Sequence, residues 1–302
     1  MGSLQRGIVF TIMAYSCWGI FPLFWMFLDE VNSFEILLSR IIWSFFFTTL
    51  FIFLIGQRKQ LLVDLKQLMA NKADFIRLFA ASIFISINWF VYIWAVTHDK
   101  VLESSLGYYI NPLITVLFGV IFFKEKLSKK TVIALCIAAL SVVILAINYG
   151  TIPWISLSLA ISFAVYSVLK KKIVLDATRG LAIETLFITP VAIIGYIYLW
   201  SEQSVSFGQA GWGTTVLLML GGIITAIPLV LFAKGAQAVP LYLIGFIQYF
   251  SPSITFLLGV FYFKEPFTSV ELLAFSCIWL AVLVFSAPKG LLSRKQKLYK
   301  YK

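Results

Sequence analysis

Three ionisable residues, Arg40, Glu103 and Glu184, stand inside or at the edge of runs built mainly from Leu, Ile, Phe and Val. An ionisable side chain in such a run is costly in a hydrocarbon environment, and it usually faces a cavity or a partner of opposite charge. We therefore expect Arg40 to face a cavity and to pair with Glu103. Glu103 and Glu184 are the candidates for a role in proton coupling.

Each of these interpretations has an alternative that needs no transport function. The long side chain of Arg40 could reach the outer membrane interface while its stem stays in the apolar layer. Glu184 could be held near the inner surface by Arg179 or Lys234. The sequence leaves these alternatives open.

Polar side chains also recur at helical spacing in two apolar segments that contain proline. Residues at i, i+4, i+7 and i+11 lie on one face of a helix, and in the segment 102–123 these are Ser104, Tyr108, Asn111 and Thr115. Pro112 removes a backbone donor there and favours a helix break. Gln248 precedes Pro252 in a similar way in the segment 240–263. Polar faces on broken helices indicate a solute path, although hydrogen bonds between helices are the alternative.

Aromatic residues accompany these polar faces. A pocket lined by aromatic rings and a few polar groups suits a modest-sized solute that is partly apolar or zwitterionic. The candidates for the binding site or transport path are Tyr15, Trp18, Arg40, Asn88, Trp89, Tyr92, Trp94, Glu103, Tyr108, Asn111, Tyr166 and Gln248, with helix breaks at Pro112 and Pro252.

The composition of the chain predicts a membrane environment for these candidate residues. Of the 302 residues, 61% are apolar and only 12% are charged, whereas a soluble domain has about 25% charged residues. A helix needs about 20 mainly apolar residues to cross a bilayer. We expect an all-α integral membrane protein with ten transmembrane helices, at approximately 6–27, 34–56, 76–97, 102–123, 131–148, 153–171, 181–200, 212–233, 240–263 and 268–288.

The positive charge of the chain, +11 at pH 7, is distributed asymmetrically over these segments. If the N-terminus is cytoplasmic, every Lys and Arg except Arg40, Lys100 and Lys264 lies on the cytoplasmic side. This distribution is the positive-inside bias. It predicts a multi-pass plasma-membrane protein with both termini in the cytoplasm. The charge is accounted for by topology, so we expect the bilayer and a small-molecule substrate as partners, and no nucleic acid.

An internal repeat divides the chain. Residues 112–125 match residues 252–265 at nine of fourteen positions, among them the Pro, Gly, Lys and Glu. Units of five helices enter the membrane from opposite sides, and inverted repeats of this kind are typical of secondary transporters. We expect one repeat at 1–148, with a cytoplasmic amphipathic segment at 57–75, a second at 149–290, and a basic tail at 291–302.

The sequence contains little that favours catalysis. The cysteines at 17, 136 and 277 are far apart, and the single histidine, His98, has no neighbours that would complete a metal site. We expect no cofactor, no metal and no enzymatic activity. An intramembrane enzyme and a passive channel remain the alternatives to a transporter.

Several of these motifs together resemble a known family. The run 88–96 (NWFVYIWAV), the run 103–113 (ESSLGYYINPL), the segment 40–44 (RIIWS) and the segment 124–127 (KEKL) are similar to the RarD group of the EamA family, within the drug/metabolite transporter superfamily. The resemblance covers essentially the whole chain.

The resemblance implies a plasma-membrane transporter, usually an exporter of metabolites or drugs, with a central cavity lined by spans from both repeats. It assigns site positions to Arg40, Asn88, Trp89, Trp94, Glu103, Tyr108 and Asn111. Two positions depart from the group: Ser39 stands where a His commonly precedes the Arg, and Lys126 stands where an Arg is frequent. The missing His weakens any proton relay that would rest on it.

Overall fold

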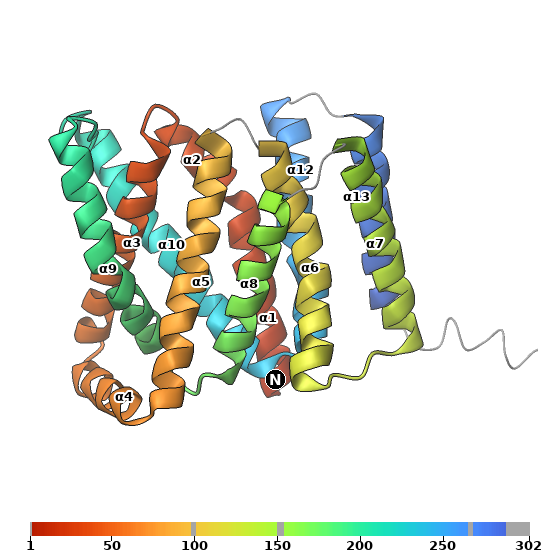
Figure 1. The fold of residues 1–302 in the computed structure, drawn as a ribbon, viewed down its shortest axis with the longest axis horizontal. Helices are drawn as coiled ribbons and strands as arrows, with labels where there is room; N and C mark the ends of the chain where they lie inside the picture. Colours follow the sequence, from red (N-terminus) through yellow and green to blue (C-terminus); the bar gives the residue numbers. More distant parts are fainter. Residues whose placement is uncertain (1, 98–100, 150–153, 265–267, 288–302) are drawn as a thin grey trace, which may run out of the picture.

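The computed structural model describes residues 2–97, 101–149, 154–264 and 268–287. Long helices run up and down between two sides of the molecule, and Figure 1 shows the N-terminus on the same side as the short helix α4. We call this side the N-terminal side and the other the opposite side. The elements are α1 (Ser3–Ile20), α2 (Pro22–Trp25), η1 (Met26–Leu28), α3 (Ser33–Leu54), α4 (Arg58–Ala70), α5 (Lys72–Thr97), α6 (Val101–Phe123), α7 (Lys129–Tyr149), α8 (Trp154–Lys172), α9 (Ala177–Ser201), α10 (Trp212–Ala238), α11 (Leu241–Gln248), α12 (Phe250–Leu258), η2 (Gly259–Phe263) and α13 (Ser269–Ser286).

Within the described residues, ten helical segments are long and apolar enough to cross a membrane, as the sequence predicted. Their ends differ from the prediction by a few residues. The seventh segment begins at Ala177 because Asp176 caps the helix, accepting hydrogen bonds from the backbone N–H groups of Thr178 and Arg179 at 3.1 Å. The eighth continues to Ala238, one turn beyond its apolar run.

The helices pack in pairs that follow the expected repeat. Helix α1 packs against α10, and its counterpart in the second half, α8, packs against α5. Helices α3 and α9 lie together at one end of the molecule, and α7 and α13 lie together at the other (Figure 1). The same local geometry also recurs at the offset of 140 residues: Lys124 and Lys264 both adopt the left-handed conformation, with φ of 52° and 59°. They end matching helices on opposite sides of the molecule.

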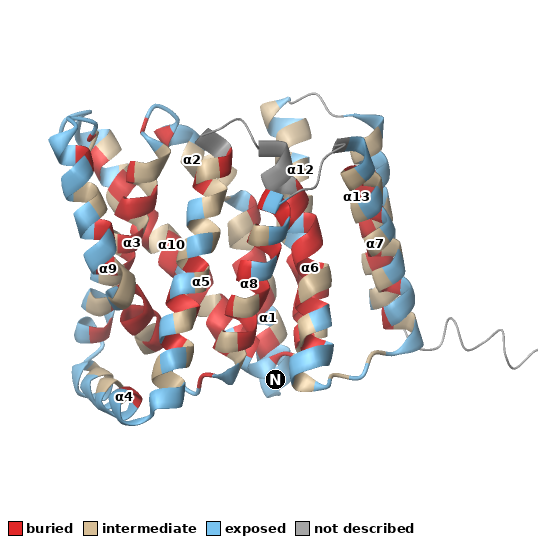
Figure 2. Cartoon of the chain, viewed as in Figure 1, coloured by how far each residue is buried: buried red, intermediate tan, exposed pale blue. Residues whose placement is uncertain are grey.

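Exposure is distributed as a membrane environment requires. Figure 2 shows buried residues gathered where helices face one another and exposed residues on the outward faces. The outward faces carry large apolar side chains, such as Ile147 on α7 and Ile194 and Ile197 on α9. Water would not favour such a surface, and lipid accounts for it.

The segment 57–75 contains the expected amphipathic helix, α4. Its Leu61, Leu65 and Leu68 pack against a small core beneath α5 and α9, while Met69 on another face is exposed. An ion pair anchors the helix to the second half, since Arg179 Nε donates to Asp64 Oδ2 at 2.5 Å.

The two proline positions differ, and one expectation is corrected. The ninth segment is divided at Tyr249, between α11 and α12, just before Pro252. Helix α6, in contrast, runs on through Pro112 without a break. Close packing accompanies this continuity: a Cβ atom at Gly245 of α11 would lie 2.8 Å from the Pro112 carbonyl oxygen. The α11 backbone therefore presses against α6 at the proline.

Candidate functional site

Arg40 turns into the helix bundle. Its Nε donates a hydrogen bond to Thr225 Oγ1 on α10 at 3.0 Å. The guanidinium carbon lies 5.0 Å from the ring centroid of Trp25 and 5.1 Å from that of Trp89. These contacts place the charge among aromatic rings from α2 and α5.

Two glycines on α10 make this position accessible to Arg40. A side chain at Gly222 would overlap the backbone of Trp43, and Ser44 Oγ donates to the Gly222 carbonyl at 2.9 Å. The backbones of α3 and α10 therefore touch. A Cβ atom at Gly221 would lie 3.7 Å from Arg40 Cγ, so the arginine stem lies directly on the glycine surface.

Two tyrosines complete what we call the Arg40 cluster: Trp25, Arg40, Trp89, Tyr92, Tyr108 and Thr225. The rings of Tyr92 and Tyr108 meet edge to face at 6.0 Å, and both tyrosines interact electrostatically with Arg40. Tyr108 nevertheless keeps 44% of its surface exposed. The cluster thus joins α2, α3, α5, α6 and α10, and it is not fully covered by protein.

Three other predicted residues lie in a packed group, which we call the aromatic core. Tyr15, Trp18 and Tyr166 pack with Phe163 and Phe232, with ring centroids 5.0 to 6.1 Å apart. The hydroxyls of Tyr15 and Tyr166 are buried and have no hydrogen-bond partner among the described residues. This group joins α1, α8 and α10 as a well-packed core.

Asn111 and Gln248 meet where the repeat-related helices α6 and α11 cross. Gln248 Nε2 donates to Asn111 Oδ1 at 3.5 Å, and Thr115 Oγ1 donates to the same oxygen at 3.1 Å. Both amides are buried. The polar face predicted in 102–123 is therefore used in part for a hydrogen bond between helices.

Asn88 and Trp94 contact α8. Asn88 Nδ2 donates to the Leu159 carbonyl at 2.8 Å and to Ser162 Oγ at 3.0 Å. Trp94 packs on Trp154 with ring centroids 5.4 Å apart. These side chains join α5 to α8. The Glu103 side chain lies outside the described residues, so its predicted pairing with Arg40 stays a prediction.

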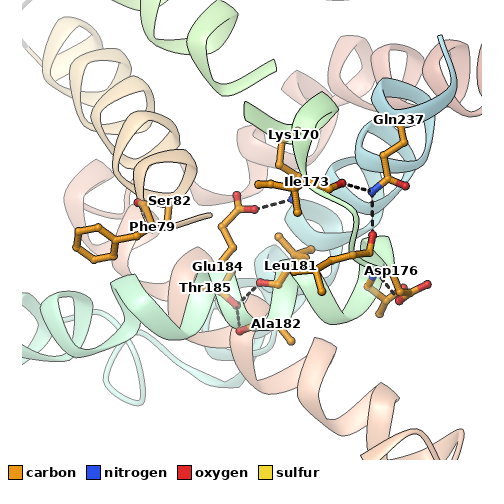
Figure 3. Close-up of polar contacts among 12 residues, drawn as sticks. Phe79, Ser82, Lys170, Ile173, Asp176, Leu181, Ala182, Glu184, Thr185 and Gln237 are labelled. Atoms are coloured by element: carbon orange, nitrogen blue, oxygen red, sulfur yellow. Dashed lines mark hydrogen bonds and ion pairs between the residues drawn. The ribbon is translucent and has the colours of Figure 1, made fainter. Parts of the chain in front are cut away.

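Glu184 has a partner that the sequence analysis did not name. Figure 3 shows the Lys170 ammonium and the Glu184 carboxylate pointing toward one another from α8 and α9. Their atoms are 2.7 Å apart, and the side chains are 4% and 1% exposed. Arg179 is occupied by Asp64, and Lys234 lies over the ring of Phe10. The alternative partners considered for Glu184 are thus corrected to Lys170.

The N-terminal side is closed by contacts between loops and helix ends. The Glu125 carboxylate accepts hydrogen bonds from the backbone N–H groups of Leu241 and Tyr242, at 2.8 and 2.9 Å. Lys171 Nζ donates to the Val239 carbonyl at 2.5 Å, and Gln237 Nε2 donates to the Leu175 carbonyl at 2.8 Å. These bonds connect the ends of α6, α8, α10 and α11.

Sequence reasoning missed Glu35 as well as Lys170 and Glu125. Glu35 is fully buried and accepts hydrogen bonds from the Ser206 and Phe207 backbone N–H groups and from the Tyr196 hydroxyl, at 2.8 to 3.0 Å. All three lie near the ends of apolar segments, where a charged residue is expected to be solvated. The spacing of Glu35, Lys170 and Glu125 carries no signal of their partners, which lie on other helices or in the loop before α10.

Comparison with known proteins assigns the fold. The model of the EamA-like transporter family matches residues 5–147 and again residues 151–287. The chain belongs to this family. An uncharacterized transporter, YojE, from Bacillus subtilis is 47% identical over 93% of this chain and 94% of that protein. Protein RarD from Escherichia coli is 35% identical over 93% of this chain and 94% of its own length.

A more distant relative and a solved structure extend these matches. The chloramphenicol-sensitive protein RarD of Pseudomonas aeruginosa is 29% identical over 96% of this chain and 97% of that protein. A crystal structure with a TM-score of 0.69 covers 93% of this chain and 97% of its own, at 19% identity, and it shows the fold alone.

The expected RarD-type EamA transporter is therefore confirmed at the level of family. The ten apolar helices and the transporter relatives make the chain an integral membrane protein of a transporter family. Within the described residues, His, Cys, Asp and Glu form no group able to hold a metal ion.

Proposed function

We propose that the chain is a secondary transporter that exports small organic solutes, drawn from amino acids, metabolites and amphipathic drugs, by alternating access. It works in the plasma membrane with both termini in the cytoplasm. Two observations support this proposal. Glu125, Lys171 and Gln237 join the helix ends on the N-terminal side, and the exposed residue Tyr108 lies beside Arg40.

In an inverted repeat, contacts of the first half on one side have counterparts of the second half on the other side. Exchanging the two sets of contacts would open the N-terminal side and close the opposite one. Such an exchange moves a solute held near Arg40 across the membrane. The positive-inside distribution supports the assignment of the N-terminal side to the cytoplasm.

Proton coupling is the candidate energy source. Glu184 is buried against Lys170, so its protonation would leave an unpaired buried ammonium and requires the pair to separate. Glu103 stands near the end of α6 at the opposite side and is the other candidate. Protons would reach the carboxyl groups of Glu184 and Glu103 from different sides of the membrane.

The test is counterflow by the purified protein in proteoliposomes. Vesicles are loaded with a mixture of amino acids, other metabolites and phenicols, and exchange is followed by mass spectrometry with and without a pH gradient. We expect saturable movement of a subset of solutes, driven by the gradient and lost in Glu103→Gln or Glu184→Gln. The double variant Glu184→Gln/Lys170→Met controls for the unpaired charge.

Several outcomes would contradict parts of this proposal. Flux that rises linearly with concentration and shows no counterflow indicates a passive channel. Saturable exchange that ignores the gradient excludes proton coupling but keeps the carrier. Chemical conversion of a solute in the vesicles indicates an intramembrane enzyme.

A further inference from the structure

The partly buried Arg40 differs from the buried Lys170 because its charge has no carboxylate partner among the described residues. A guanidinium has five N–H donors. In the described part of the chain, only Nε has an acceptor, the hydroxyl of Thr225. The outer edge of the guanidinium, with its two terminal NH₂ groups, therefore remains available for an acceptor that the protein does not supply there.

The surroundings of that edge favour an anion. Aromatic rings replace water around the guanidinium, with Trp25 and Trp89 about 5 Å from its carbon, and a charge in such surroundings interacts more strongly with a counter-ion. A carboxylate matches the planar edge of a guanidinium with two parallel hydrogen bonds. The same positive charge disfavours a cationic solute at this place.

The other cluster residues favour a flat apolar group beside the anion. Tyr92 and Tyr108 meet edge to face next to Arg40, and 44% of the Tyr108 surface is uncovered. A ring on the solute can pack on these side chains and gain the contacts typical of aromatic pairs. Their hydroxyls supply neutral donors and add no competing charge.

We propose that the carried solute is a small organic acid whose carboxylate binds the terminal NH₂ groups of Arg40 and whose flat apolar part packs on Tyr92 and Tyr108. This inference rests on the proposed transport function and names the substrate class of its site. Thr225 acts as a positioning residue: its hydroxyl donates to the Gly221 carbonyl at 2.7 Å and so turns a lone pair toward Arg40.

The test compares three probes that share one ring and differ in charge: phenylacetate, 2-phenylacetamide and 2-phenylethylamine. Equilibrium binding is measured on the full chain in phosphatidylcholine nanodiscs. We expect phenylacetate to bind at least tenfold more tightly than the amide, because the bidentate charge-assisted hydrogen bonds are lost. The amine is expected not to bind.

Variants locate the site. Arg40→Met is expected to abolish phenylacetate binding, and Arg40→Lys to weaken it about tenfold because lysine lacks the planar fork. The matched control is Lys234→Met, which removes another cation lying over an aromatic ring, that of Phe10. It should leave phenylacetate binding unchanged.

Four results would overturn the proposal. The first is equal binding of phenylacetate and its amide, and the second is unchanged binding in Arg40→Met. The third is tighter phenylacetate binding in Glu103→Gln together with strong destabilisation by Arg40→Met, which would assign Arg40 to an internal ion pair. Loss of phenylacetate binding in nanodiscs that contain phosphatidylglycerol would assign the site to a lipid headgroup, and this outcome also overturns it.

The counterflow experiment separates this inference from the transport function. If other solutes exchange but phenylacetate neither exchanges nor competes, the transporter stands and the organic acid is wrong. If phenylacetate binds through Arg40 but no solute exchanges, the anion site stands and the transport function fails.

Discussion

Two cations inside this helix bundle, the buried Lys170 and the partly buried Arg40, have different partners. Lys170 has its own counter-ion, Glu184, at 2.7 Å, and the pair is almost completely covered. Arg40 has aromatic rings and one hydroxyl, and no carboxylate among the described residues. Both charges lie among apolar helices, where an unpaired ion is costly.

The difference indicates two roles. Lys170 is neutralised within the protein, holds α8 to α9 and needs no ligand. Arg40 lacks a counter-ion and is neutralised only when an anion binds. The positions agree with these roles. Lys170 is in the last turn of α8, which ends at the N-terminal side, and Arg40 is in the first half of α3, which begins at the opposite side (Figure 1).

The largest effect is expected when the internal pair is broken. Lys170→Met leaves the Glu184 carboxylate buried without a partner, and we expect a loss of about 3–5 kcal/mol in the free energy of unfolding. Arg40→Met removes a charge that has no internal counter-ion; it loses one hydrogen bond and two cation–π contacts and should cost less, about 1–2 kcal/mol. Unfolding titrations in mixed micelles measure both values.

The double variant Lys170→Met/Glu184→Met is the control for this comparison. It removes both charges and should recover most of the lost stability, since two apolar side chains can replace a buried ion pair. Equal costs for Lys170→Met and Arg40→Met would contradict the distinction and indicate that Arg40 also has an internal counter-ion.

The second effect concerns the packing that positions Arg40. Gly222→Ala places a methyl group against the Trp43 backbone, and overpacking of this kind typically costs about 1–3 kcal/mol. We expect a larger loss of the counterflow rate than the loss of stability alone would cause, because α3 shifts and moves Arg40 with it. Gly213→Ala on the same helix meets nothing within 4 Å and is the matched control. An unchanged Arg40 site in Gly222→Ala, seen as normal phenylacetate binding, would argue against this positioning.

The third effect concerns the closure of the N-terminal side. Glu125→Gln keeps the shape of the side chain, but only one of its two oxygens remains to accept the Leu241 and Tyr242 N–H groups. One lost hydrogen bond is worth about 1 kcal/mol, which changes the ratio of closed to open molecules about fivefold. We expect faster maleimide labelling of Ala236→Cys, a buried position on α10, in a background without the native cysteines.

Glu271→Gln provides the control, because Glu271 accepts the Thr268 backbone N–H at 2.7 Å at the opposite side. Glu271→Gln changes the same type of hydrogen bond, from a backbone N–H group to a carboxylate, and leaves the contacts on the N-terminal side unchanged. Equal labelling in Glu125→Gln and in the unmodified protein would show that Glu125 does not hold the closed state.

The sequence predicted the fold because the required signals are local. Span length, apolar composition and the match between 112–125 and 252–265 depend on residues close in the chain, and the ten helical segments and the family are confirmed. Pro112 shows where a local rule fails. Helix α6 continues through the proline, and α11 packs against the proline carbonyl oxygen, a contact that the local sequence does not indicate.

The site could be predicted only in part, because its contacts join distant segments. Charge in an apolar run identified Arg40 and Glu184, but it could not identify Thr225 or Lys170 as their partners. Lys170 stands in a run of three lysines at the end of α8, and such a run is typical of a solvated helix end. Helical spacing likewise grouped Trp18 with the solute path, whereas its ring contacts place it in the aromatic core. The site roles of these residues stay predictions.

The smallest effect separates Tyr166 of the aromatic core from Tyr108 of the Arg40 cluster. The buried Tyr166 hydroxyl lies beside Glu184 but makes no hydrogen bond of good geometry among the described residues, so removing it relieves part of a desolvation cost. Tyr166→Phe should therefore stabilise the protein by up to about 1 kcal/mol and leave phenylacetate binding unchanged.

Tyr108→Phe is the matched variant. Its hydroxyl lies near Arg40 at an exposed position, so stability should stay constant, whereas phenylacetate binding weakens a few fold. Glu184 interacts electrostatically with Tyr166, and this neighbour defines the contrary outcome. If Tyr166→Phe destabilises the protein by more than about 1 kcal/mol, the hydroxyl donates to Glu184 and belongs to the Lys170–Glu184 pair. The internal pair would then be a network of three groups, still closed to ligands, and the contrast with the open edge of Arg40 would become sharper.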